Sequence, residues 1–277
     1  MSGASDLAAS ATAYFEDLQG RLCAAFETFE PDSRFVARRW TKPPGHPLEG
    51  GGDSRLMRGA VFEKVGVNVS HVWGVLSPAA RAQVSGADAS DGRFVACGIS
   101  LVAHMTNPYV PTVHMNLRYL ATSRAWFGGG ADLTPTFAFD DDTAAFHAAL
   151  RRACDGYRAD AYAEFKAWCD RYFYLPHRQE PRGVGGIFFD DLSSGDSGAD
   201  FAFVRSVGEA LLEVYPLIVA RRRDTPYDDA ARERLLLKRG RYVEFNLVYD
   251  RGTRFGFSTD ADPAAGSSGT PQGPRRY

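Results

Sequence analysis

The chain is short of cysteine and lysine and has no long apolar run, and each shortage excludes a class of protein. Its four cysteines contain no Cys-x-x-Cys pair, which argues against a thiolate zinc site and favours a reducing compartment. No run reaches the ~18 apolar residues of a membrane-spanning helix. Only four of the 32 basic residues are lysines, and the formal net charge is -2, so a strongly basic nucleic-acid surface is not expected.

Several catalytic signatures are missing as well. The sequence contains no phosphate loop, no His-Glu-x-x-His, no Gly-x-Ser-x-Gly elbow and no dinucleotide fingerprint, so hydride transfer with a nicotinamide is unsupported. Residues 6–29 carry four acidic side chains, unlike a secretory signal or a transit peptide. We therefore expect a cytoplasmic protein, with a mitochondrial location as the alternative.

The hydrophobic pattern predicts a mixed fold. With 277 residues and 44% hydrophobic content, the chain can bury a large core. Apolar residues recur at helical spacing over residues 7–29, 140–156, 157–174 and 200–220, and alternate as in half-buried strands over residues 61–75, 98–104, 113–120 and 241–249. Residues 187–189 and 255–257 are further strand candidates. We predict an α+β single domain over residues 1–259, whose antiparallel sheet is covered by helices.

Two segments have the composition of flexible surface. Residues 42–52 hold three prolines and three consecutive glycines, and residues 259–274 are rich in Gly, Ser, Pro and Ala. We expect residues 260–277 to form a flexible tail.

The most informative stretch is 100–118. In strands, Ser100 and His104 share one face, and His114, Asn116 and Arg118 share one face of the next strand. If the two strands form a hairpin around the proline-rich connector, the histidines oppose each other. Imidazoles, an amide and a guanidinium favour a functional face, although a solvated structural face remains the alternative.

Other polar residues are open to two interpretations. Asp132 follows Gly128-Gly129-Gly130, a segment suited either to close ligand approach or to a glycine bulge with a capping Asp. Asp190 and Asp191 are either paired acid–base groups or the end of a strand. His46, His71, His147 and His177, taken singly, are more often structural than metal ligands.

Five blocks of sequence resemble one family. They are the decapeptide VGVNVSHVWG at 65–74, residues 98–120, residues 126–135, the stretch WCDRYFYLPHRQEPRGVGGIFFDDL at 168–192, and residues 239–253. In this order they are similar to the oxygen-dependent coproporphyrinogen III oxidases of haem biosynthesis, and the likeness covers residues 20–259.

The resemblance implies an oxidoreductase that acts on CH–CH groups with O2 as acceptor. Such an enzyme decarboxylates two propionates of coproporphyrinogen III to vinyl groups and yields protoporphyrinogen IX, CO2 and H2O2. The family fold is a large antiparallel sheet flanked by helices on both sides, with a deep substrate cleft, in a homodimer. No organic cofactor is implied, and a divalent metal is the open question.

The resemblance also implies roles for individual residues. His114 matches the proton donor, and Asp132 matches the acid that engages the pyrrole N–H groups or acts as base. Substrate binding is implied for Ser100, Asn116, Leu117 and Arg118, and Arg118 suits a propionate because a guanidinium binds a carboxylate bidentately. The histidines that match metal-ligand positions are His104, His114, His147 and His177.

The sequence departs from the family pattern in two places. Met105-Thr106 replace the usual Pro-basic pair after His104, and residues 260–277 lack the family's Glu-Ser-x-Leu-Met-Ser and Arg-Trp motifs. A non-catalytic tetrapyrrole-binding relative is therefore the second hypothesis. A hydrolase with a metal held by four convergent histidines is the third.

Overall fold

Seven antiparallel strands form the centre of the molecule. In the computed structural model, which describes residues 2–82 and 84–253, the strand order is β1-β2-β3-β4-β5-β6-β9. The strands are β1 (Val36–Thr41), β2 (Leu48–Met57), β3 (Phe62–Val75), β4 (Arg93–Met105), β5 (Thr112–Ala121), β6 (Ala125–Thr134) and β9 (Gly185–Leu192), and β7 (Tyr174–Leu175) pairs with β8 (Glu180–Pro181) in a separate ribbon. The predicted antiparallel sheet is thus confirmed.

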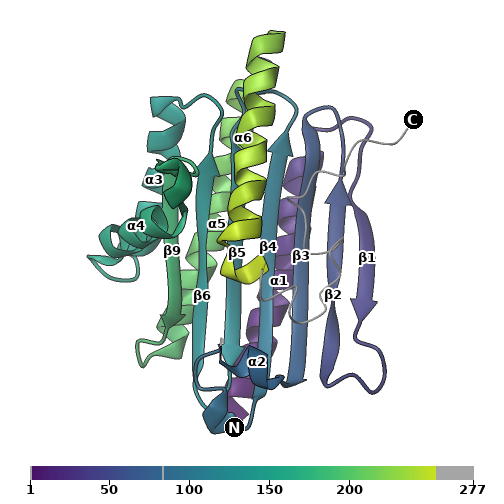
Figure 1. Ribbon diagram of the computed structural model, residues 1–277, viewed down its shortest axis with the longest axis vertical. Coiled ribbons are helices and arrows are strands. Elements are labelled where there is room, and N and C mark those ends of the chain that lie inside the picture. Colours follow the sequence, from purple (N-terminus) through teal and green to yellow (C-terminus); the bar gives the residue numbers. More distant parts are fainter. Residues whose placement is uncertain (1, 83, 254–277) are drawn as a thin grey trace.

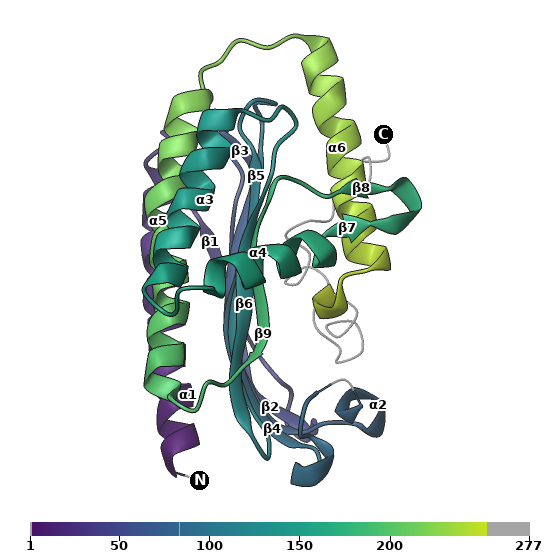
Figure 2. The same ribbon diagram turned by 90° about the vertical axis from the view of Figure 1, so that its left-hand side faces the viewer.

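Helices lie on both faces of this sheet, as predicted (Figures 1 and 2). The long helices α1, α3 and α5 cover one face, α6 and the short α2 lie over the other, and α4 packs beside β9. Their bounds are α1 (Ser2–Glu27), α2 (Pro78–Arg81), α3 (Asp140–Asp155), α4 (Ala161–Tyr172), α5 (Ser197–Arg222) and α6 (Asp229–Val248), with 3-10 turns at Asp88–Ser90 and Pro176–Arg178.

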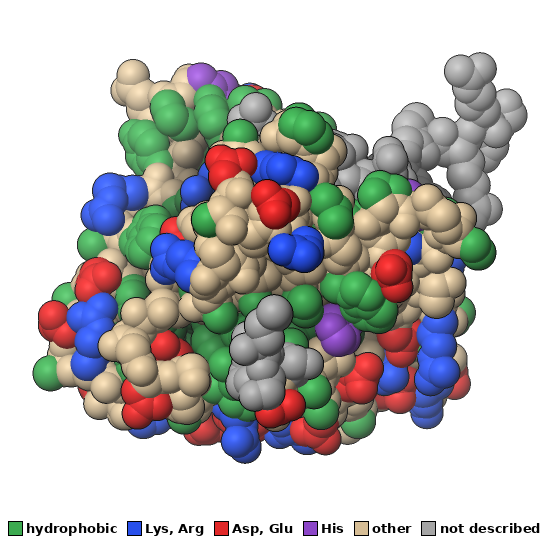
Figure 3. Space-filling view, turned by 90° about the horizontal axis from the view of Figure 1, so that it is seen from below, with side chains coloured by type: hydrophobic (Ala, Val, Ile, Leu, Met, Phe, Trp, Pro, Cys, Tyr) green, Lys and Arg blue, Asp and Glu red, His purple; other side chains and the backbone are tan. Residues whose placement is uncertain are grey.

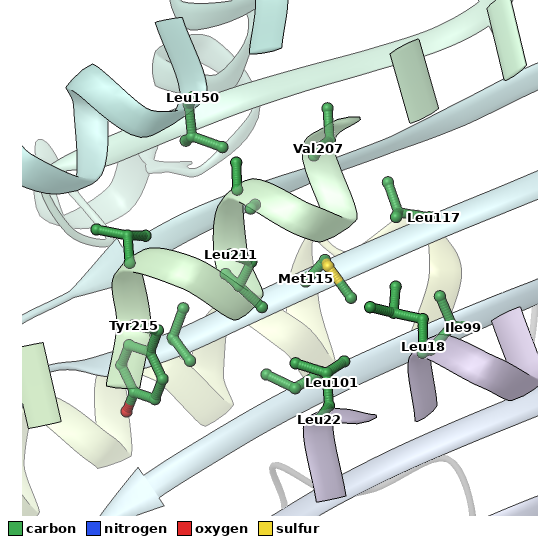
Figure 4. Close-up of a cluster of buried hydrophobic side chains, with 14 of the residues drawn as sticks. Leu18, Leu22, Ile99, Leu101, Met115, Leu117, Leu150, Val207, Leu211 and Tyr215 are labelled. Carbon is green, nitrogen blue, oxygen red and sulfur yellow. The ribbon is translucent and has the colours of Figure 1, made fainter. Parts of the chain in front are cut away.

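The main core lies between the sheet and the layer of α1, α3 and α5. Figure 4 shows how apolar side chains from β4 and β5 meet those from the two long helices. Leu18 and Leu22 of α1, Leu117 of β5 and Leu211 of α5 are fully buried there. Burial of each such side chain stabilises the fold by ~1.5–3 kcal/mol. The alternation in the central strands therefore leaves their polar side chains on the opposite face.

The prediction of a strand over 241–249 is wrong, because residues 241–248 belong to α6 and Tyr249 is the C-cap of that helix. Asp228 caps this helix by accepting a hydrogen bond from the Ala231 amide at 2.8 Å. Leu235, Tyr242 and Phe245 are buried on it, a spacing that fits a helical stripe better than a strand face. Nine alternating residues could not distinguish the two periods, since good helix formers precede them without a break.

The prediction of a flexible surface over 42–52 is also wrong in part, since Gly50, Gly51 and Gly52 lie within strand β2. A Cβ atom on Gly52 would approach the Trp40 ring to 2.8 Å, and one on Gly50 would approach the Trp73 ring to 2.8 Å. The glycines therefore admit tryptophan rings across the strand. The predicted strand at 255–257 and the tail at 260–277 lie outside the described residues.

Figure 3 shows acidic and basic side chains interspersed over the face seen from below. Among the described helices, none combines the length and the apolar character that a bilayer crossing requires.

A buried carboxylate fastens the end of α1 to the start of β3. Glu30 accepts hydrogen bonds from the backbone amides of Ala60, Val61 and Phe62 at 2.9, 2.8 and 2.7 Å. Its residue is 3% exposed, so water cannot replace it as the acceptor for these amides.

We expect Glu30→Ala to lower the free energy of unfolding by about 3 kcal/mol or more, because each buried amide left without an acceptor costs ~1–3 kcal/mol. Urea denaturation measures the loss. The control is Glu213→Ala, which removes a side chain that is 66% exposed. Equal stabilities of the two variants would contradict the assigned role of Glu30.

Candidate active site

One face of the central strands gathers the polar residues singled out in the sequence. We call it the polar face: the side of the sheet away from α1, α3 and α5, which carries Ser100, His104, His114, Asn116, Arg118 and Asp132. Asn116 of β5 pairs with Ser100 of β4, and His114 pairs with Asp132 of β6. The predicted sharing of one face by the serine, the two histidines, the asparagine and the arginine is confirmed, and the structure adds Asp132 to that face.

The predicted opposition of the two histidines is wrong by two residues along the strands. Val102 of β4 pairs with His114, and Ala103 pairs with Val113. His104 consequently lies beside Thr112, with 3.4 Å between His104 Nδ1 and Thr112 Oγ1. The connector between the strands sets this register.

A cluster of three charged or ionisable groups lies at the centre of the polar face. His114 Nδ1 is 2.9 Å from Asp132 Oδ1. The Arg182 guanidinium donates to both oxygens of the same carboxylate, at 2.7 and 2.8 Å from Nη2. Side chains of Asp132 and Arg182 are each 2% exposed, while that of His114 is 23% exposed. His114 is thus the member of the cluster that faces solvent.

The geometry also fixes how His114 can act. An imidazole whose Nδ1–H donates to a carboxylate keeps Nε2 for other partners, and the carboxylate stabilises the protonated ring. Burial acts to raise the pKa of Asp132, but the charge of Arg182 and the His114 hydrogen bond outweigh it, so the pKa lies below its ordinary value. Asp132 is therefore ionised and able to hold His114 in this tautomer.

Arg182 is the residue that sequence reasoning missed. Its guanidinium carbon lies 3.9 Å from the ring centre of Phe173, 4.5 Å from that of Tyr242 and 4.8 Å from that of Phe245. Arg182 comes from the segment before β9, whereas two of the rings come from α6. A signal existed, since an aspartate on a buried strand needs a cationic partner. The sequence holds 27 other arginines and four lysines, however, and no spacing rule selects one of them.

Leu117 lies on the other side of the sheet from the rest of its set. Its side chain is fully buried in the helix-covered core, in the cluster that Figure 4 draws with Met115 and Leu211. Only its backbone borders the polar face. The structure therefore brings Ser100, Asn116 and Arg118 together and leaves the Leu117 side chain apart.

The family model described as coproporphyrinogen III oxidase matches residues 10–264. The protein named oxygen-dependent coproporphyrinogen-III oxidase from Rickettsia bellii (strain OSU 85-389) is 50% identical over 263 residues, which are 92% of each chain. Relatives of the same name from Rickettsia conorii and Rickettsia akari are 49% identical, over 92% and 91% of this chain and 92% of their own lengths.

The chain belongs to the coproporphyrinogen III oxidase family. The matched range extends past both ends of the likeness seen in the sequence, and it includes the polar face and α6 entire.

The four histidines that resemble metal ligands in this oxidase family do not fit a shared metal site. His147, on α3, has Nε2 3.0 Å from the Val184 carbonyl and Nδ1 2.8 Å from the Tyr162 hydroxyl. His177 contacts Glu244 and Tyr249 through its two ring nitrogens at 2.7 and 2.8 Å. Within residues 2–82 and 84–253, no three His, Cys, Asp or Glu side chains are placed to hold one ion.

His104 has a different environment from the other oxidase histidines. It is 3% exposed and packs edge-on against Tyr242, with ring centres 5.3 Å apart. Burial, followed by the nearby charge of Arg239, lowers its pKa to about 3. Nε2 of His104 is buried with no hydrogen-bond partner among the described residues. The ring is therefore neutral at physiological pH.

We expect Arg182→Met to lower the free energy of unfolding by about 3–5 kcal/mol, because Asp132 would stay buried without its partner charge. Chemical denaturation measures the loss. The double variant Arg182→Met/Asp132→Asn removes both charges, so it should recover part of the stability. A double variant no more stable than the single one would show that the ion pair is not the cause.

The buried neutral ring of His104 predicts a pH effect. Above the unfolded-state pKa of about 6.5 both states are neutral and stability is full. Below it His104 binds a proton in the unfolded chain, whereas in the folded chain it stays neutral until the pH approaches 3. Stability should therefore fall by about 2 kcal/mol between pH 7 and pH 5 from this group alone.

His104→Gln isolates that contribution, because all other groups titrate in both proteins. Urea denaturation at the two pH values should give the wild type the steeper loss by the stated amount. Parallel losses in the two proteins would rule out a buried neutral His104.

Proposed function

We propose that this chain catalyses the oxygen-dependent decarboxylation of two propionates of coproporphyrinogen III to vinyl groups, producing protoporphyrinogen IX. The observation that carries the proposal is the polar face itself: a carboxylate-anchored His114 and Arg118 on the same face of β5, in a chain that is 50% identical to proteins named for this activity. The relatives' printed name supplies the substrate and the use of O2. No organic cofactor is part of the proposal.

The reaction balances with groups that the polar face presents. Each propionate, with one proton and one O2, becomes a vinyl group, CO2 and H2O2. The bond from the carboxyl carbon to the α carbon breaks, the β carbon loses hydrogen, and O2 takes the two electrons. A protein performing this step must hold the carboxylate and supply a proton to reduced oxygen, and it must keep the reacting side chain away from bulk water.

Arg118 is the group that we assign to substrate carboxylate. Its side chain is 31% exposed on the polar face, and a guanidinium forms paired hydrogen bonds with a carboxylate. Asn116 and Ser100 form the pair two residues along the strands from it and complete the predicted binding set. The Leu117 contribution would come through its backbone.

His114 is the group that we assign to proton transfer. Asp132 holds its Nδ1, which directs Nε2 away from the carboxylate. The predicted contact of Asp132 with pyrrole N–H groups requires the carboxylate to exchange partners, because Arg182 and His114 occupy it. In the described conformation Asp132 acts through His114. It could bind the substrate directly only if the hydrogen bonds from Arg182 to its carboxylate were broken.

A homodimer in the cytoplasm is the remaining part of the proposal. Apolar side chains on the outer surface of α6 support self-association, because Leu236, Leu237, Leu247 and Val248 are each at least 50% exposed. The four described cysteines are free and buried, which fits a reducing compartment. Light scattering after size-exclusion chromatography measures the mass, and a mass of 30.3 kDa would reject the dimer.

A direct assay tests the activity. Coproporphyrinogen III prepared without oxygen should yield protoporphyrinogen IX and H2O2 only after O2 is admitted. EDTA should change the rate less than about twofold, since the histidines engage protein groups instead of converging. An O2-independent product, or no product from a protein that binds the tetrapyrrole tightly, would overturn the proposal.

We expect His114→Ala to lower kcat by about 100-fold or more while Kd for the tetrapyrrole changes little, because general acid–base catalysis contributes ~10²–10⁴. The matched control is His71→Ala, which removes an imidazole from the other side of the sheet, where His71 of β3 lies opposite Cys97 of β4 in the strand register. Steady-state kinetics compare the two. Near-normal turnover by His114→Ala would contradict the role of His114 in proton transfer.

A further inference from the structure

Strand β9 carries a bulge beside the polar face. The register between β6 and β9 shifts between Phe127 and Gly129, so that Asp190 and Asp191 together oppose Gly128. Asp191 has φ 51°, a left-handed conformation that residues other than glycine adopt rarely. A bulge turns one side chain away from the regular alternation. Here it leaves Asp190 directed across β6 toward β5.

The Asp190 carboxylate meets Arg118 above a glycine. Arg118 Nη2 is 2.8 Å from Asp190 Oδ1, although the two residues belong to strands that flank β6. A Cβ atom on Gly128 would lie 2.6 Å from Asp190 Oδ1 and 2.9 Å from Arg118 Nε and Nη2. The ion pair can therefore cross β6 only because residue 128 has no side chain.

Arg118 is held from two sides and still has donors to offer. Nη1 donates to Asn116 Oδ1 at 3.0 Å, and Nη2 meets Asp190. These two contacts do not exhaust the five N–H donors of a guanidinium. Arg251, which follows α6, places Nη2 3.6 Å from the other Asp190 oxygen. Two arginines around one aspartate carry a net charge of +1, which suits one additional carboxylate.

We propose that Asp190 is a positioning residue for substrate binding, which holds the Arg118 guanidinium across Gly128 in the orientation that receives a propionate of the tetrapyrrole. The inference rests on the proposed function. Asp190 acts through Arg118 and does not itself contact the substrate, since two carboxylates in contact repel. Pre-orienting Arg118 reduces the conformational entropy lost on binding.

Coproporphyrin III, the fluorescent oxidised form with the same four carboxylates, tests this without turnover. We expect Asp190→Asn to raise its Kd by roughly fivefold to tenfold, as a charge-assisted hydrogen bond becomes a neutral one. The matched control is Asp191→Asn, which alters the exposed neighbour, retains a residue suited to positive φ, and should stay within about twofold of wild type. In turnover, Asp190→Asn should raise KM by a similar factor with kcat nearly unchanged.

Two further variants separate positioning from a general structural effect. In an Arg118→Met background, Asp190→Asn should change Kd by less than about twofold, since the residue through which it acts is gone. Gly128→Ala should weaken binding as Asp190→Asn does, although it alters neither charged residue. Asp190→Glu should restore part of the affinity.

The outcomes separate the two proposals. Wild-type Kd in Asp190→Asn, or equal effects of that change with and without Arg118, would overturn the positioning role. A wild type that binds coproporphyrin III but converts no coproporphyrinogen III in O2 would overturn the proposed function, and the binding comparison would still decide the role of Asp190.

Discussion

The buried ion pair between Asp132 and Arg182 is the constraint on which the arrangement of the polar face depends. Two charges at 2% exposure are tolerated only when each satisfies the other. Asp132 belongs to β6, while the rings around Arg182 come from the end of α4 and from α6. The pair therefore joins the sheet to the helix that lies over it. The same carboxylate orients His114, so packing of α6 and orientation of the imidazole share one cause.

Glycine decides where long side chains can lie on this sheet. Trp40 and Trp73 lie over glycines of β2, and the Arg118–Asp190 pair lies over Gly128 of β6. Glycine in the interior of a strand lowers the stability of that strand. At each of these positions, however, the absent side chain lets a larger group approach the backbone closely. The bulge in β9 has a similar local cost. Asp191 adopts an unfavourable φ there, and the Asp190 side chain is thereby directed across β6.

The strands and helices that the sequence predicted correctly are those whose apolar residues recur at a regular short spacing. The alternation in β3, β4 and β5 placed Asn116 and Arg118 on one face correctly, and the apolar stripes predicted α1, α3, α4 and α5. Periodicity failed for α6, where nine alternating residues mimic a strand, and for β2, where three glycines mimic a loop. Arg182 could not be predicted, because its pairing with Asp132 joins residues 50 positions apart. The bulge at Asp190 was missed for the same reason: it is a property of the register between two strands.

The charges on the polar face explain why two aspartates can stand where an anionic substrate would bind. Asp132 is paired with Arg182, and Asp190 lies between Arg118 and Arg251. An arginine neutralises each carboxylate, so neither aspartate strongly repels a propionate. What distinguishes the two sites is burial. The Asp132 pair is sealed and orients His114, whereas the Asp190 pair is partly exposed and orients Arg118. One kind of interaction, an Arg–Asp pair, thus holds the proposed proton-transfer residue beside Asp132 and the proposed carboxylate-binding residue over Gly128.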